Sequence, residues 1–206
     1  MVQSTERHGV RRRGGRGSLA LLSIVLAGVV LAAGCGQQDS GSDAESQQDQ
    51  TTSEANLLPE DVVVALDGVQ SYFPEIERQT ATGENSTAAD APDATRMVIY
   101  EGGDGRRVTI SVDHYASPDA ASTAFEQAID KSEVVQGFTP LPAPTDVGDK
   151  AFAGSVTQGP DTHIGYGALA GDYVVGVTSA GYPATPENVD KLTGLTRDAV
   201  AKATTA

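Results

Sequence analysis

The chain has 206 residues, of which 28 are acidic and 14 basic, so its formal net charge at pH 7 is −14. Such a surface repels phosphate, and nucleic acid, anionic lipid headgroups and acidic wall polymers are therefore disfavoured as direct partners. The single cysteine excludes an internal disulfide. The three histidines lack the spacing of a metal site, so we expect no metal and no cofactor.

Residues 1–34 have the organisation of a secretory signal peptide. Arg7–Arg16 contains five arginines, and Ser18–Gly34, "SLALLSIVLAGVVLAAG", contains no charge. A basic segment before an apolar one enters the membrane with its basic end on the cytoplasmic side. These 17 apolar or small residues are at the short limit of the roughly 17–25 that span a bilayer, so an uncleaved membrane anchor is the alternative.

The apolar run ends in the sequence Leu31-Ala32-Ala33-Gly34-Cys35. This segment resembles the lipobox of bacterial lipoproteins, although the usual leucine stands three places before the cysteine and here it is four places before. The resemblance implies cleavage between Gly34 and Cys35 and a diacylglycerol thioether on Cys35. Two acyl chains hold a protein stably at a membrane, so we expect an extracytoplasmic protein anchored in the cell membrane. Transfer to an outer membrane is allowed in a two-membrane organism, and ordinary secretion is the other alternative.

We expect residues 35–56 to be the lipidated cysteine and a disordered tether. Its sequence from residue 36, "GQQDSGSDAESQQDQTTSEAN", has five acids, no base and almost nothing apolar to bury. A flexible chain of this length spans about 25 Å. Without the leader, nine basic and 27 acidic side chains remain, a net charge of −18. Residues 57–206 have the length of a single domain.

The first half of this domain predicts one helix and a strand pair. Apolar residues recur at helical spacing over Leu57–Phe73, and a polar loop follows over Thr80–Thr95. Arg96–Tyr100 and Arg107–Tyr115 are predicted strands, because apolar and polar residues alternate in the second and "EGGDG" between them suits a hairpin turn.

The second half predicts two capped helices and three strands. Ser117 and Thr185 are each followed by proline, as at a helix start. Between the helices, "VVQGFTPLPAPTDV" reads as a proline-broken connection. Short turns then join three predicted strands in a meander: Ala151–Thr157, Thr162–Leu169 and Tyr173–Thr178. The order α-ββ-α-βββ-α predicts an α+β fold, a roughly five-stranded antiparallel sheet backed by two or three helices.

The stretches "VDHYASPDAASTAF" and "VGDKAF" resemble small exported actinobacterial lipoproteins and kinase ectodomains. The pattern over roughly Arg96–Ala203 is also similar to Mog1/PsbP-like lipoproteins. None of these resemblances implies a catalytic residue.

We identify no catalytic residues in the sequence. Ser111 and Asp113 share one strand face and His114 points to the other, so they cannot form a triad. If the domain has a ligand site, we expect it at strand ends rich in aromatic side chains. The candidates are Tyr100, Tyr115, Tyr166, Tyr173, His114 and His163.

The anchor, the tether and the missing catalytic constellation together favour a non-catalytic binding module. Its ligand would be an envelope protein or a small apolar molecule. The alternatives are a lipid carrier with an internal cavity and an envelope enzyme without a recognisable motif.

Overall fold

The computed structural model describes residues 57–82, 91–159 and 161–206. The predicted leader, Gly34, Cys35 and the tether lie outside the described residues. Within these ranges, no helix combines the length and apolar character that a membrane span requires.

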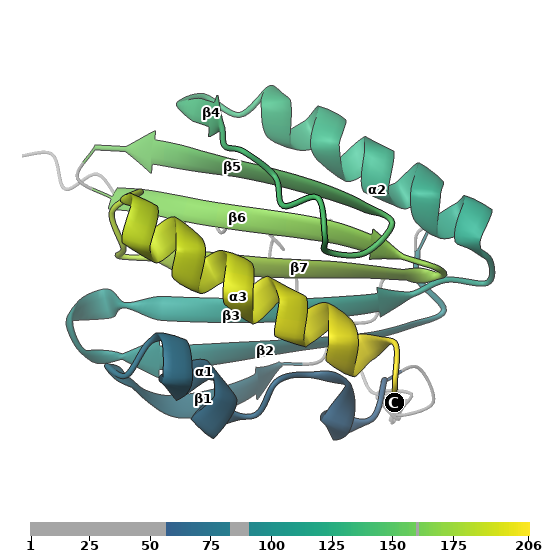
Figure 1. Ribbon diagram of the computed structural model, residues 1–206, viewed down its shortest axis with the longest axis horizontal. Coiled ribbons are helices and arrows are strands. Elements are labelled where there is room, and N and C mark those ends of the chain that lie inside the picture. The colour runs from purple at the N-terminus through teal and green to yellow at the C-terminus, as the bar shows by residue number, and fades with distance from the viewer. Residues whose placement is uncertain (1–56, 83–90, 160) are drawn as a thin grey trace, which may run out of the picture.

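The described residues form one seven-stranded antiparallel sheet in the spatial order β1-β2-β3-β7-β6-β5-β4 (Figure 1). The strands are β1 (Ile76–Thr82), β2 (Ala94–Gly102), β3 (Arg107–His114), β4 (Phe138–Pro140), β5 (Lys150–Gln158), β6 (Asp161–Ala170) and β7 (Tyr173–Ala180). The predicted α+β class, the antiparallel sheet and the final meander are confirmed. The predicted number of five strands is wrong.

The two strands that the prediction missed, β1 and β4, are the edges of the sheet. An edge strand pairs on one side only, so its sequence need not show the apolar alternation of a central strand. β1 reads "IERQTAT" and is mostly polar. β4 has three residues and contains Pro140, which is tolerated where one side of the strand makes no ladder hydrogen bonds.

The predicted helix over Leu57–Phe73 is confirmed only in its second half. The chain forms a short 3₁₀ helix, η2 (Glu60–Val62), and then a separate helix, α1 (Leu66–Tyr72). Val63 and Val64 between them are buried outside any helix. Three consecutive β-branched residues lose side-chain freedom in a helix, which explains the break.

The other two helices begin at the predicted caps. In α2 (Pro118–Glu133) the Ser117 hydroxyl accepts a hydrogen bond from Ala120 N, and in α3 (Pro186–Ala203) the Thr185 hydroxyl accepts one from Asn188 N. The helices cover opposite faces of the sheet.

On the face that we call the α3 face, α1 and α3 pack over the larger hydrophobic core, in front of the sheet in Figure 1. On the opposite face, the α2 face, Ala121 and Phe125 of α2 pack against Leu169 of β6 and Val174 of β7. The α2 face carries the candidate site.

Candidate functional site

The register of the sheet places two neighbouring rows of small residues on the α2 face. One row crosses β6, β7 and β3 through Gly167, Gly176 and Ser111. The next row crosses β5, β6, β7 and β3 through Gly154, Gly165, Thr178 and Thr109. Because glycine has no side chain, little fills the space above the sheet along these rows, and the second row lies beside the end of α2.

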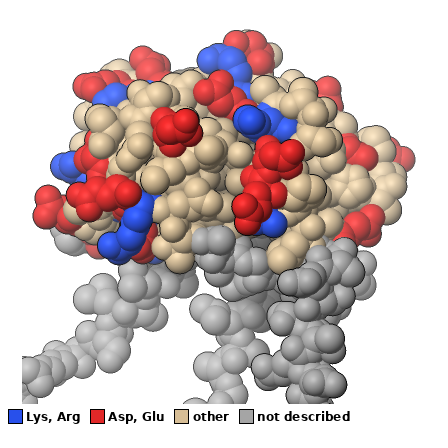
Figure 2. All heavy atoms as spheres, turned by 90° about the horizontal axis from the view of Figure 1, so that it is seen from below, with Lys and Arg blue, Asp and Glu red and all other residues tan. Residues whose placement is uncertain are grey.

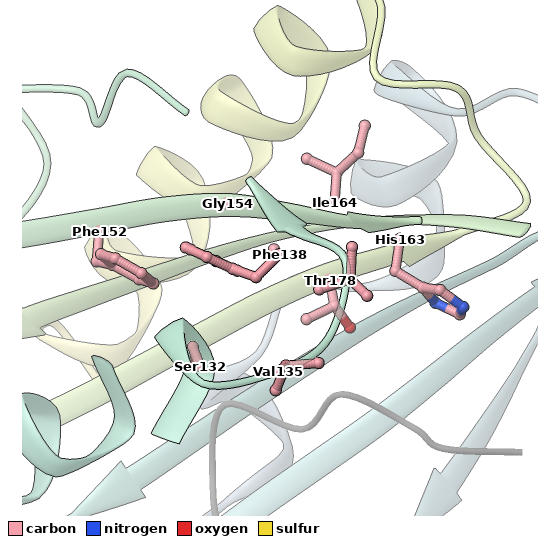
Figure 3. A pocket seen from close by; sticks show the side chains of 10 residues that line it. Ser132, Val135, Phe138, Phe152, Gly154, His163, Ile164 and Thr178 are labelled. Atoms are coloured by element: carbon pink, nitrogen blue, oxygen red, sulfur yellow. The ribbon is translucent and has the colours of Figure 1, made fainter. Parts of the chain in front are cut away.

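A cavity lies above this floor, where the end of α2 meets β4, β5, β6 and β7 (Figure 3). The volume of this cavity is about 30 Å³. Its lining is mainly apolar: Ser132, Val135, Phe138, Phe152, Gly154, Val156, His163, Ile164, Gly165 and Thr178. A site of this kind, apolar with a few polar groups, is the usual form of a small-molecule pocket.

Two aromatic rings form one side of the cavity. Phe138 of β4 and Phe152 of β5 stack with ring centroids 5.8 Å apart and planes inclined by 9°. The Phe138 ring lies directly on Gly154, where an added Cβ would be 2.2 Å from a ring carbon. The glycine therefore permits the edge strand β4 to bring its aromatic ring onto the sheet.

His163 lies on the other side of the cavity, across from these rings (Figure 3). Burial lowers the pKa of its imidazole, the positive charge of Arg107 lowers it further, and Asp161 opposes both effects. The imidazole is therefore neutral at pH 7 and can donate one hydrogen bond and accept another. The other polar side chain at this end of α2, Ser132, already donates its hydroxyl hydrogen to Ala128 O at 2.7 Å, so it has no hydrogen left to donate to a ligand.

Asp113 is a buried acid on the same face, in the next cross-strand row beyond Ser111, where it lies opposite Val174. It is 4% exposed, and its Oδ1 accepts a hydrogen bond from the Thr95 hydroxyl at 2.5 Å. Burial raises the pKa of its carboxyl from 3.8 to about 6, although the Thr95 hydrogen bond opposes the shift. Ionisation of a buried carboxyl lowers the stability of the folded state. Acids with strongly shifted pKa values are common at functional sites.

The structure does not bring the predicted tyrosines together. Tyr100 and Tyr166 are fully buried on the α3 face, where the Tyr100 hydroxyl donates to the Val64 carbonyl. Burial raises the pKa of Tyr100 to about 12. Tyr115 packs in the separate cluster of the α2 face.

His114 and Tyr173 are brought together at the end of the sheet near α2. They are cross-strand partners in β3 and β7, and their rings are 4.9 Å apart. His114 Nε2 lies 3.3 Å from Asp172 Oδ2. This group is on the α3 face, so of the predicted candidates only His163 lines the cavity.

The sequence contains a signal for this site beyond the aromatic and histidine candidates. Glycine recurs on one face of the predicted meander, as Gly154, Gly165, Gly167 and Gly176. In-register pairing places Gly154 beside Gly165 and Gly167 beside Gly176, and the first of these pairs lines the cavity.

The face of the molecule seen in Figure 2 mixes charges of both signs. Figure 2 shows acidic side chains interspersed with fewer basic ones on the face seen from below. Among the described residues, no group of three or more His, Cys, Asp or Glu is placed to hold a metal ion.

The chain was compared with known proteins. No protein family and no curated protein matches it. The extracellular domain of PknH from Mycobacterium tuberculosis is similar in structure, with a TM-score of 0.47 and 14% identity over 68% of this chain and 93% of that one. A GTP-binding regulator from Thermotoga maritima has a TM-score of 0.38 and 12% identity over 66% and 89%. At these scores neither similarity supports a functional argument.

Proposed function

We propose that this protein is a lipid-anchored, extracytoplasmic binding module without catalytic activity, and that its ligand site is the cavity on the α2 face. The observation that carries the ligand site is the apolar lining of that cavity, with stacked rings on one side and a neutral histidine on the other. The anchor rests on the leader and on Cys35.

The size of the cavity limits what enters it. A cavity that binds benzene measures about 150 Å³, whereas this one measures about 30 Å³. A fatty acyl chain is too large to enter this cavity whole. A ligand inserts one small apolar group, or it displaces the Phe138 ring, which is held by the three-residue edge strand β4.

The ligand site is tested with hexanamide, a neutral probe with a short apolar chain. We expect millimolar hexanamide to shift the amide NMR signals of cavity residues in the chain 35–206 carrying Cys35→Ser. Thr178→Leu fills the cavity and should abolish these shifts. Thr80→Leu is the matched control, because Thr80 lies in the same cross-strand row on β1, outside the cavity. Shifts that survive Thr178→Leu, or no shifts at all, would refute the ligand site.

The anchor is tested in the full-length chain. Radioactive palmitate should label the wild type and not Cys35→Ser, and the mutant should remain an uncleaved precursor or leave the detergent-extractable membrane fraction. Mass spectrometry that finds an unmodified thiol on a mature N-terminus would contradict the anchor.

A further inference from the structure

Arg107 lies beside the cavity on the α2 face. The next cross-strand row after the small residues runs through His163 of β6, Ala180 of β7 and Arg107 of β3. Two cross-strand steps separate Arg107 from His163, about 10 Å between side-chain origins. Within this row, Ala180, whose side chain is a single methyl group, lies between them.

The charges around Arg107 leave its guanidinium available. Its direct partner on β2 is Glu101, but Glu101 Oε2 accepts hydrogen bonds from Arg78 Nε at 2.8 Å and Nη2 at 2.6 Å. Among the described residues, Arg107 makes no ion pair and no side-chain hydrogen bond. It is half-buried, so water screens its charge less than that of a fully exposed arginine.

We propose that the ligand of this site is a small monocarboxylate with an apolar body. This inference rests on the proposed ligand site. The end of the apolar body enters the cavity beside Phe138 and Val156, the carboxylate pairs with Arg107, and the His163 N–H donates a hydrogen bond to the carboxylate.

A single carboxylate suits this arrangement better than a phosphate. The planar guanidinium matches a carboxylate with two parallel hydrogen bonds. One unpaired arginine neutralises one charge, and the surrounding protein, with a net charge of −18 after removal of the leader, repels a dianion.

The test compares hexanoate with hexanamide, which has the same chain without the charge, and with acetate, which has the charge without the chain. We expect hexanoate to bind about three- to tenfold more tightly than hexanamide, since the ion pair is only partly buried. Acetate should bind weakest of the three. Arg107→Gln should remove the preference for hexanoate and leave hexanamide binding unchanged.

The matched control is Arg106→Gln. The neighbouring guanidinium lies over the Tyr182 ring, 5.8 Å from its centroid, and Tyr182 belongs to the core of the α3 face. This variant should keep the preference for hexanoate. Circular dichroism checks that both variants are folded.

The pKa of His163 provides a second readout. Residues 35–206 contain two histidines, His114 and His163, so their ring signals can be assigned with one substitution each. A bound carboxylate favours the charged imidazole, so hexanoate should raise the pKa of His163, and hexanamide should not. The ring signals of His114 should keep their positions when either probe is added.

The outcomes separate the two proposals. If hexanamide and hexanoate bind equally, or if Arg107→Gln keeps the preference, the carboxylate proposal is overturned and the cavity remains a ligand site. If neither probe shifts the cavity signals, both proposals are overturned.

Discussion

Replacing Asp113 by asparagine should stabilise the protein at neutral pH. The Asp113 carboxyl is 4% exposed, and its pKa rises from 3.8 to about 6 on folding because burial penalises the ionised form. At 1.36 kcal/mol per pKa unit, ionisation of this group in the folded state costs about 3 kcal/mol. Asparagine avoids that cost, and its side-chain oxygen still accepts the hydrogen bond from Thr95.

The sign of the pH dependence follows from the raised pKa. Between about pH 4 and pH 6 the folded state binds more protons than the unfolded state, so the contribution of Asp113 to stability is lost as the pH rises through this window. Asp113→Asn should therefore be more stable than wild type by about 1–3 kcal/mol at pH 7.5, with the difference vanishing near pH 3.5.

Urea unfolding followed by circular dichroism across this pH range measures the difference. Subtracting wild type from mutant cancels the titration of other acids that do not contact Asp113. Asp104→Asn is the control, because Asp104 is exposed and asparagine tolerates its positive φ of 58°. The reasoning fails if Asp113→Asn is less stable than wild type at pH 7.5, or if the difference is independent of pH.

Five further substitutions test a packing contact, a buried hydrogen bond and a helix cap. Gly154→Ala should cost about 1–3 kcal/mol in the free energy of unfolding, because the new methyl overlaps the Phe138 ring; an unchanged urea midpoint would contradict this contact. Tyr100→Phe removes a buried hydrogen bond and should cost about 1–2 kcal/mol. The Tyr166 hydroxyl makes no hydrogen bond of normal geometry among the described residues, and the nearby Thr193 hydroxyl donates to Val189 O, so Tyr166→Phe should cost less. Equal losses of unfolding free energy in the two tyrosine variants would contradict this expectation. Thr185→Ala should destabilise α3 by about 1 kcal/mol, and Thr185→Ser should restore most of the loss.

The candidate site was harder to predict from the sequence than the secondary structure. Phe138 lies in a segment that reads as a proline-broken loop, yet its ring packs on Gly154 of the next strand. Asp113 reads as one of the polar residues of an alternating strand, and only the packed α2 face makes it buried. His163 was a candidate by residue type, but its neighbour Arg107 is 56 positions earlier in the chain, and the order β3-β7-β6 places them in one row.

The sequence by itself determined what depends on nearby residues. The Ser117 and Thr185 caps each act within one turn, and the short turns between β5, β6 and β7 allow only adjacent pairing. The tertiary structure alone decided the edge strands, the burial of Asp113, and the cavity that combines Phe138 with His163. The physical reason is that these features arise from contacts between strands that are distant in the sequence. The residues of one segment do not show which other segment they will contact.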